Sequence, residues 1–182
     1  MLKNLSIKSR LIFVIALLSL IMLAIGIGGL VSIAKVNASL KTVYEDRVIA
    51  LGQLDHIVRV IDTNQFLVAK AVSGDPAQAG AEMDKVTAGI ADLDKTSSAY
   101  MATYLTPEEK ALSEKYRDIR KNYLQTTLKP AMDALRAQDT KTATDIVQGS
   151  MTRELPALND AANALIQLQL DTAKAEYEKS QR

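Results

Sequence analysis

The chain opens with one long apolar stretch and continues with an amphipathic pattern that lasts to its end. No charged residue occurs from Leu11 to Ala34, and most of this stretch reads LIFVIALLSLIMLAIGIGGLV. A helix over residues 11–34 is about 36 Å long at about 1.5 Å per residue, which exceeds the ~30 Å hydrocarbon core of a bilayer. We therefore predict a transmembrane helix at residues 11–34.

Basic residues lie on the N-terminal side of this stretch. Lys3, Lys8 and Arg10 precede it, with no acidic residue among them. Because lysine and arginine are enriched on the cytoplasmic side of membrane helices, we expect residues 1–10 in the cytoplasm and the domain after Lys35 outside. A cleaved signal peptide is the alternative, but its apolar part is usually shorter, and no clear A-x-A cleavage pattern follows here.

The first amphipathic segment has the spacing of a coiled-coil helix. Its repeating positions alternate at intervals of four and three, which predicts a helix over residues 35–72, continuous with the apolar stretch. Serine, glycine, aspartate and proline then gather in a turn signal at residues 73–80. The repeating positions are Leu40, Tyr44, Arg47, Leu51, Leu54, Val58, Ile61, Gln65, Val68 and Val72.

Three further helices are expected, over residues 78–104, 107–137 and 140–182. Because short connections join the helices, consecutive helices run antiparallel. We therefore predict an all-α fold, with the N-terminal transmembrane helix followed by an antiparallel up-down-up-down four-helix bundle in residues 35–182. The chain then returns toward the membrane at Arg182, and we expect it to be the front end of a longer protein with a second span.

Local signals mark the ends of these helices. Thr106 can cap the third bundle helix, with Pro107 at the first helical position and Glu109 completing a capping box. Pro130 falls inside that helix and should kink it or remove one hydrogen bond. Asp139 can cap the fourth helix.

Composition and charge exclude several kinds of function. The net charge is +1, and no stripe of lysine and arginine with interleaved aromatic residues occurs, so we expect no nucleic-acid partner. There is no cysteine, which leaves the compartment open, and His56 is the single histidine. Without cysteine no Cys-His site can form, and a single histidine does not make a histidine-rich metal site. We expect no catalytic residue, no metal ion and no cofactor.

Four segments carry a resemblance to a known family. They are MLKNLSIKSRLIFVIALLSLIMLAIGIGGL, KTVYEDRVIALGQLDHI, TPEEK and QLQLDTAKAEYEK. Together they resemble bacterial methyl-accepting chemotaxis proteins with a four-helix-bundle ligand-binding domain. The resemblance implies a homodimeric receptor of the bacterial inner membrane, with its sensor domain in the periplasm. It also implies that the full-length protein acts on a cytoplasmic kinase and its adaptor.

The resemblance also implies a place for the ligand and a way to transmit its binding. Ligands of the family bind where the first and fourth bundle helices of two protomers meet, and binding shifts the fourth helix toward the cytoplasm. Of the three arginines in amino-acid receptors, this chain keeps Arg59, with Asn64 and Val68 at the other two positions. Arg59 can pair with a carboxylate, or it can form a surface ion pair with Asp55 or Asp62. The candidates on the fourth helix are Gln148, Ser150, Thr152 and Arg153, for which a solvated face is the alternative.

A second candidate site lies on the third bundle helix. Tyr116, Arg120 and Tyr123 place an arginine between two tyrosines, an arrangement that can hold an organic or aromatic acid. The alternative is that the tyrosines pack in the core and the arginine lies on the surface.

The leading interpretation is a chemoreceptor input module that binds a small molecule, such as an organic acid or an amino acid. The same module could instead serve a sensor histidine kinase or a diguanylate cyclase. A third possibility is a membrane-anchored structural or protein-interaction bundle that binds no small ligand.

Overall fold

The structure is a computed structural model that describes residues 7–43, 47–103 and 105–180. The described residues are helical apart from short turns, and no strand occurs among them, which confirms the predicted all-α fold. The chain divides into two compact units, residues 1–44 and residues 45–182.

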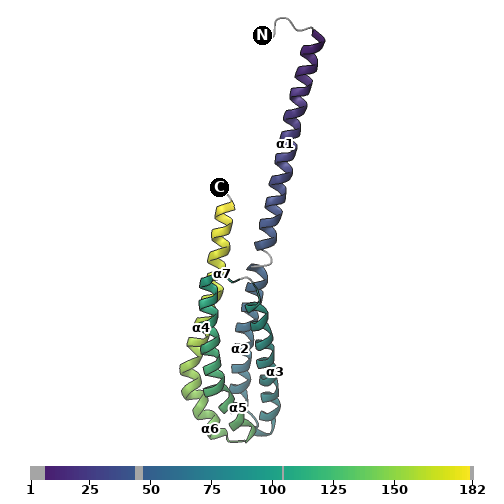
Figure 1. Cartoon of the computed structure of the whole chain (residues 1–182). Helices are drawn as coiled ribbons and strands as arrows, with labels where there is room; N and C mark the ends of the chain where they lie inside the picture. Colours follow the sequence, from purple (N-terminus) through teal and green to yellow (C-terminus); the bar gives the residue numbers. More distant parts are fainter. Residues whose placement is uncertain (1–6, 44–46, 104, 181–182) are drawn as a thin grey trace. The chain divides into compact units, whose positions relative to one another are not determined.

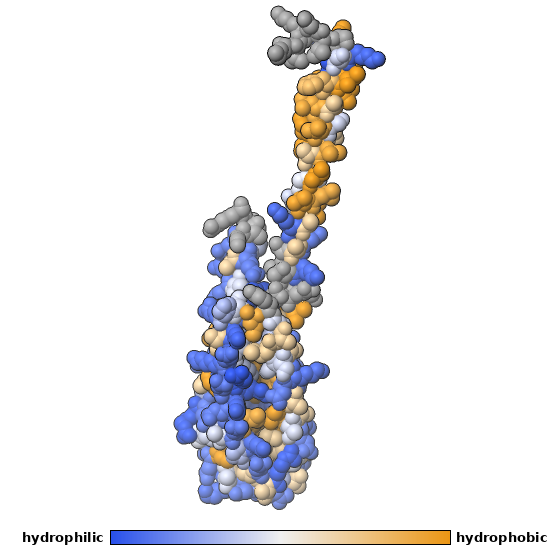
Figure 2. Space-filling view, viewed as in Figure 1, coloured by the Kyte–Doolittle hydropathy of each residue, from blue (hydrophilic) through white to orange (hydrophobic). Residues whose placement is uncertain are grey.

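The first unit consists of one apolar helix, α1 (Ile7–Val43). Its large apolar side chains are exposed all along its length, as the orange surface in Figure 2 shows. Residues Ile7–Ala38 are long and apolar enough to cross a membrane, by length and composition. The predicted continuity with the next helix falls on residues 44–46, which lie outside the described residues.

The second unit is an antiparallel bundle of four helical rods, and Figure 1 shows its up-down-up-down course. The first two rods contain the helices α2 and α3, and the π-helical residues Arg47 and Val48 precede α2. Each of the other two is a pair of α-helices joined by one π-helical turn, η2 between α4 and α5 and η3 between α6 and α7. The bounds are α2 (Ile49–Ser73), α3 (Pro76–Met101), α4 (Pro107–Tyr123), η2 (Leu124–Leu128), α5 (Lys129–Arg136), α6 (Thr140–Ile146), η3 (Val147–Met151) and α7 (Thr152–Ser180).

Side-chain caps fix three of the helix starts. The Asp75 carboxylate accepts a hydrogen bond from the Ala77 backbone N–H at 2.9 Å, so α3 begins before the expected residue 78. The predicted capping box between Thr106 and Glu109 is present at the start of α4. Asp139 caps α6 as predicted, because its carboxylate accepts from the Thr142 N–H at 3.0 Å.

π-helical turns precede the internal prolines of the third and fourth rods. Pro130 cannot donate to the carbonyl of Thr126, which would break the ladder of a regular helix. The chain widens into η2 just before it, where the Lys129 N–H bonds to the Leu124 carbonyl five residues back. Helical structure continues on both sides of Pro130, and η3 likewise precedes Pro156 of α7.

The buried face of α2 differs in part from the predicted stripe. Leu54, Ile61 and Val68 are buried as predicted, and so is Arg47. The remaining inward positions are Ala50, Ile57, Asn64 and Ala71, whereas Leu51, Val58, Gln65 and Val72 are only half-buried. The reason is that α2 packs against both α3 and α7, so its buried face is wider and rotated relative to a single coiled-coil seam.

Candidate functional site

A cavity of about 330 Å³ opens between α3 and α4, near the end of the bundle where α3 stops and α4 starts. Leu54 and Ile57 of α2, with Ala162 and Leu165 of α7, form its apolar floor. This volume is at the low end of the roughly 300–1,000 Å³ that small-molecule sites occupy. The cavity therefore suits a compact ligand.

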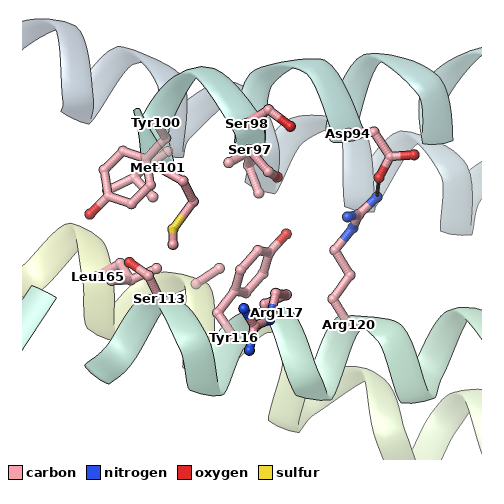
Figure 3. A pocket seen from close by; sticks show the side chains of 13 residues that line it. Asp94, Ser97, Ser98, Tyr100, Met101, Ser113, Tyr116, Arg117, Arg120 and Leu165 are labelled. Atoms are coloured by element: carbon pink, nitrogen blue, oxygen red, sulfur yellow. Dashed lines mark hydrogen bonds and ion pairs between the residues drawn. The ribbon is translucent and has the colours of Figure 1, made fainter. Parts of the chain in front are cut away.

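Small side chains on facing helices create the space. Ser97 and Ser98 of α3 lie across from Ser113 of α4, at positions where a bundle usually places leucine or isoleucine. Tyr116 of α4 points toward the two serines of α3, and Met101 lies beside them (Figure 3).

Three hydroxyl groups in this cavity, those of Ser97, Ser113 and Tyr116, lack a hydrogen bond of good geometry to any described residue. The Ser97 hydroxyl nevertheless lies near that of Tyr116, and the Ser113 hydroxyl lies near that of Tyr100. Ser113 is only 2% exposed and Tyr116 only 5%. Buried polar groups are almost always hydrogen-bonded, so these hydroxyls are available to a molecule that enters the cavity.

Charged side chains lie at one end of the cavity. The Arg120 guanidinium donates to the Asp94 carboxylate at 2.7 Å, as the dashed line in Figure 3 marks. The Arg120 side chain is 15% exposed, whereas that of Asp94 is 62% exposed. Arg117 also lines the cavity and pairs with its neighbour Asp118 at 3.2 Å. An anion that replaced Asp94 at Arg120 would leave Asp94 in water, where its charge costs little.

The tyrosines of the cavity are neutral at physiological pH. Burial raises the pKa of Tyr116 to about 12, although the nearby positive charge of Arg120 acts in the opposite direction. Burial likewise raises the pKa of Tyr100. Both phenols therefore keep their protons and can donate hydrogen bonds.

A chain of hydrogen bonds, buried except at its last link, leads from the cavity to Arg47 just before α2 and to Glu176 near the end of α7. The Gln169 amide of α7 donates to the Tyr100 hydroxyl at 3.4 Å and to the Glu109 carboxylate at 2.6 Å. The Arg47 guanidinium donates to Glu109 at 2.7 Å and to the Gln169 carbonyl oxygen at 3.1 Å. It also pairs with Glu176, near the end of α7, at 3.1 Å. Arg47, Glu109 and Gln169 are all buried, so no one of them can move without the others.

The carboxylates around Arg47 keep it charged. Burial opposes the positive charge, but hydrogen bonds and charge attraction from Glu176 and Glu109 outweigh it and raise the pKa of Arg47. Arg47 thus stays positively charged across the physiological range of pH.

Four of the sequence-predicted site residues lie on or beside the cavity. Tyr116 and Arg120 line it, and Arg120 also borders a neighbouring cavity of about 20 Å³ together with Tyr123 and Asn64. Tyr123 is buried, and burial raises its pKa. Asn64 is buried with both amide atoms unpartnered among the described residues, and its side chain packs against the bare Cα of Gly89.

The other predicted site residues lie elsewhere. Arg59 is largely exposed and pairs with Asp55 at 2.7 Å, in agreement with the surface ion pair considered for it. Gln148 and Ser150 belong to η3, and the Ser150 hydroxyl bonds to the Ile146 carbonyl at 3.4 Å. Thr152 and Arg153 are exposed at the start of α7. None of these five lines either of the two cavities.

Several lining residues were not among the predicted site residues. They are Asp94, Ser97, Ser98, Tyr100, Met101, Ser113 and Arg117. The available signal was a serine at an inward position on each of two consecutive helices, which predicts missing volume in a core.

Comparison with known proteins identifies the family. A family model described as "Four helix bundle sensory module for signal transduction" matches residues 4–182. No curated protein and no solved structure matches the chain.

Proposed function

The chain belongs to the four-helix-bundle sensory modules of methyl-accepting chemotaxis proteins, and we propose that it is a membrane-anchored input module that binds a small carboxylate-bearing metabolite outside the membrane. The observation that carries the proposal is the hydrogen-bond chain from Tyr100 to Arg47 and Glu176, which is buried except at Glu176. It connects a ligand-sized cavity with the start of α2 and the last turns of α7. A change at the cavity can therefore reach the helix ends from which a signal leaves.

The anchor in this proposal is α1. Its exposed apolar surface is incompatible with water along residues Ile7–Ala38, and a bilayer is the environment that removes that cost. The basic residues Lys8 and Arg10 at its start favour a cytoplasmic N-terminus, so the bundle lies in the periplasm. In the full receptor we expect two copies of the module side by side, as in the family it belongs to.

The signal in this proposal is a displacement of α7 relative to α2. Gln169 and Glu176 are both on α7, and both bond to Arg47 of the first rod. A shift of α7 along its axis must break or exchange these bonds, which gives the bundle two discrete arrangements. A ligand drives the shift only to the extent that it binds one arrangement better than the other.

A ligand screen on the full chain in detergent micelles tests the proposal. The denaturation midpoint would be measured against panels of amino acids, organic acids and aromatic acids. A ligand at one hundred times its Kd stabilises the folded chain by about 2.7 kcal/mol, which is readily seen. We expect one class of carboxylate to raise the midpoint. If no compound does, the sensory proposal fails and a structural or protein-interaction role takes its place.

A further inference from the structure

We propose that the cavity between α3 and α4 is a ligand site within a single protomer, and that it takes a small monocarboxylate with a compact apolar body and one hydrogen-bonding substituent. The inference rests on the proposed sensory function and adds the place and chemical class of the ligand. It moves the site away from Arg59 and the start of α7, where the family resemblance had placed it.

The floor and walls of the cavity select the body of the ligand. Leu54, Ile57, Ala162 and Leu165 offer only carbon atoms to the interior, and Met101 adds a polarisable thioether. A volume of about 330 Å³ admits a single ring or a short branched chain, and excludes larger molecules. A flat ring gains most, because Tyr116 and Tyr100 present aromatic surface to the same space.

The unpartnered hydroxyls select a polar substituent on that body. Ser113 and Tyr116 are more than nine-tenths buried, and their hydroxyl oxygens make no hydrogen bond of good geometry within the described chain. Each can donate one hydrogen bond and accept others. A ligand hydroxyl placed among them satisfies groups that otherwise lack a partner, which is the kind of contact that discriminates between a ligand and its deoxy analogue.

The charges at the cavity select one carboxylate and no more. Arg120 and Arg117 against Asp94 give the lining a net positive charge of one. A ligand carboxylate can replace Asp94 on the mostly buried Arg120, while Asp94 turns to water. A second carboxylate would face either the apolar floor or Asp94, so dicarboxylates are disfavoured.

Isothermal titration calorimetry on the full chain in lipid nanodiscs tests the inference with 4-hydroxybenzoate as the probe. Two analogues isolate the two polar contacts: 4-hydroxybenzamide lacks the charge, and benzoate lacks the hydroxyl. We expect 4-hydroxybenzoate to bind and each analogue to bind about tenfold more weakly. Equal affinity for the acid and the amide would overturn the proposed role of the arginine.

Two matched substitutions locate the site. Arg120→Gln should weaken binding of 4-hydroxybenzoate about tenfold or more. Arg136→Gln is the control, because Arg136 makes the equivalent ion pair from α5 to Asp84 of α3, at 2.9 Å, away from the cavity. It should leave the affinity unchanged. An equal loss in both variants would mean that binding only follows bundle stability, and would overturn the site.

Variants that fill the cavity, compared with a variant at Arg59, distinguish the cavity site from the site that the family resemblance implies. Ser113→Leu should abolish binding while circular dichroism shows unchanged helix content, and Ser97→Leu serves the same purpose if the first variant unfolds. Arg59→Ala should have no effect, because Arg59 does not line the cavity. The opposite pattern, binding that survives filling and is lost in Arg59→Ala, would overturn the cavity site and leave the sensory function standing. Failure of the broader carboxylate panel would overturn both.

Discussion

Arg47 and Glu109 form an ion pair that is almost completely removed from water. Arg47 is 5% exposed and Glu109 is fully buried, and their side chains meet at 2.7 Å. Removing one partner of such a pair leaves the other as an uncompensated buried charge, and this typically costs about 3–5 kcal/mol. The pair is therefore much more sensitive to substitution than the surface ion pairs of the bundle.

We predict that Glu109→Ala lowers the free energy of unfolding by about 3 kcal/mol or more, because it orphans Arg47 and also removes half of the capping box. Urea denaturation of the full chain in mild detergent measures the change. Glu108→Ala is the control, since Glu108 is the exposed neighbour in the same helical turn, and it should change stability by less than about 0.5 kcal/mol. Equal effects would show that the buried pair is not a major source of stability.

Alkaline pH should destabilise the bundle through its buried tyrosines. The pKa of Tyr116 is about 12 in the folded chain, whereas an unfolded tyrosine titrates near 10. Between these values the folded chain holds protons that the unfolded chain has lost, so the free energy of unfolding falls as pH rises. The stability that the raised pKa of Tyr116 contributes is fully present below about pH 10.

Denaturation midpoints at pH 9 and pH 11 test this expectation. The fall in the denaturation midpoint from pH 9 to pH 11 should be smaller in Tyr116→Phe, because this variant lacks one of the phenols whose pKa is raised. Tyr177→Phe is the matched control, because Tyr177 is 64% exposed and should leave the pH dependence as it is in the original chain. If the midpoint of Tyr116→Phe fell as much as that of the original chain, Tyr116 would not be a source of the alkaline destabilisation.

At the scale of single residues, the sequence predicts which side chains face inward better than it predicts which side chains they contact. The spacing of α2 already places Arg47 on the inner stripe, and the capping motif already identifies Glu109. Nothing in the sequence pairs them, because they are 62 residues apart in the chain and meet only in the folded bundle. The same holds for Arg120, whose nearest acid, Asp94, lies on another helix.

Helix packing depends at one point on the absence of a side chain. Gly89 of α3 lies against the buried amide of Asn64 on α2, and a Cβ at residue 89 would come within 2.3 Å of the Asn64 amide oxygen. This close approach accompanies the most extensive helix-to-helix contact in the bundle, between α2 and α3.

We predict that Gly89→Ala lowers the free energy of unfolding by about 1–3 kcal/mol, since overpacking forces the two helices apart. Gly80→Ala is the control, because a Cβ at residue 80 would meet nothing within 4 Å, and there the better helix propensity of alanine should stabilise by about 0.5–1 kcal/mol. Thermal unfolding measures both. The double variant Asn64→Ala with Gly89→Ala should recover most of the loss if the clash is its cause.

Elements with strong local signals are the ones that the sequence predicts well. The capping box at Thr106 fixes the start of α4, and the turn at Asp139 fixes the start of α6. The π-helical turns are not predictable in the same way. Pro130 predicts an interruption of the α-helical hydrogen bonds. Whether the helix kinks or widens there depends on its packing against the neighbouring rods.

At the scale of the whole molecule, cysteine labelling in cells tests the proposed orientation of the chain in the membrane. The chain has no cysteine, so a single introduced thiol is the only one present. A maleimide that cannot cross the inner membrane should label Ser73→Cys, at the exposed end of α2, in intact cells. Ser9→Cys, at the start of α1, should react only after the inner membrane is permeabilised. Labelling of Ser9→Cys in intact cells would reverse the topology.

Fold and site differ in how far the sequence determines them. Four amphipathic segments with short connections have few ways to pack, so the all-α bundle follows from pattern alone. The cavity depends on which small side chains face each other, such as Ser97 and Ser113, and on helix rotation that the pattern leaves open. Tyr116 and Arg120 were within reach of prediction because they share one helix face, one turn apart.

The π-helical turns η2 and η3 affect how this chain should be aligned with its relatives. Each of them accommodates one residue more than an α-helical turn, so a rod that contains one behaves as a helix with a single-residue insertion. Beyond that point the sequence periodicity is out of phase by about 100°. An ungapped alignment against a chain with regular helices would assign every later residue to the wrong face. The exposed positions Gln125 and Gln148 lie in these turns, and gaps belong there.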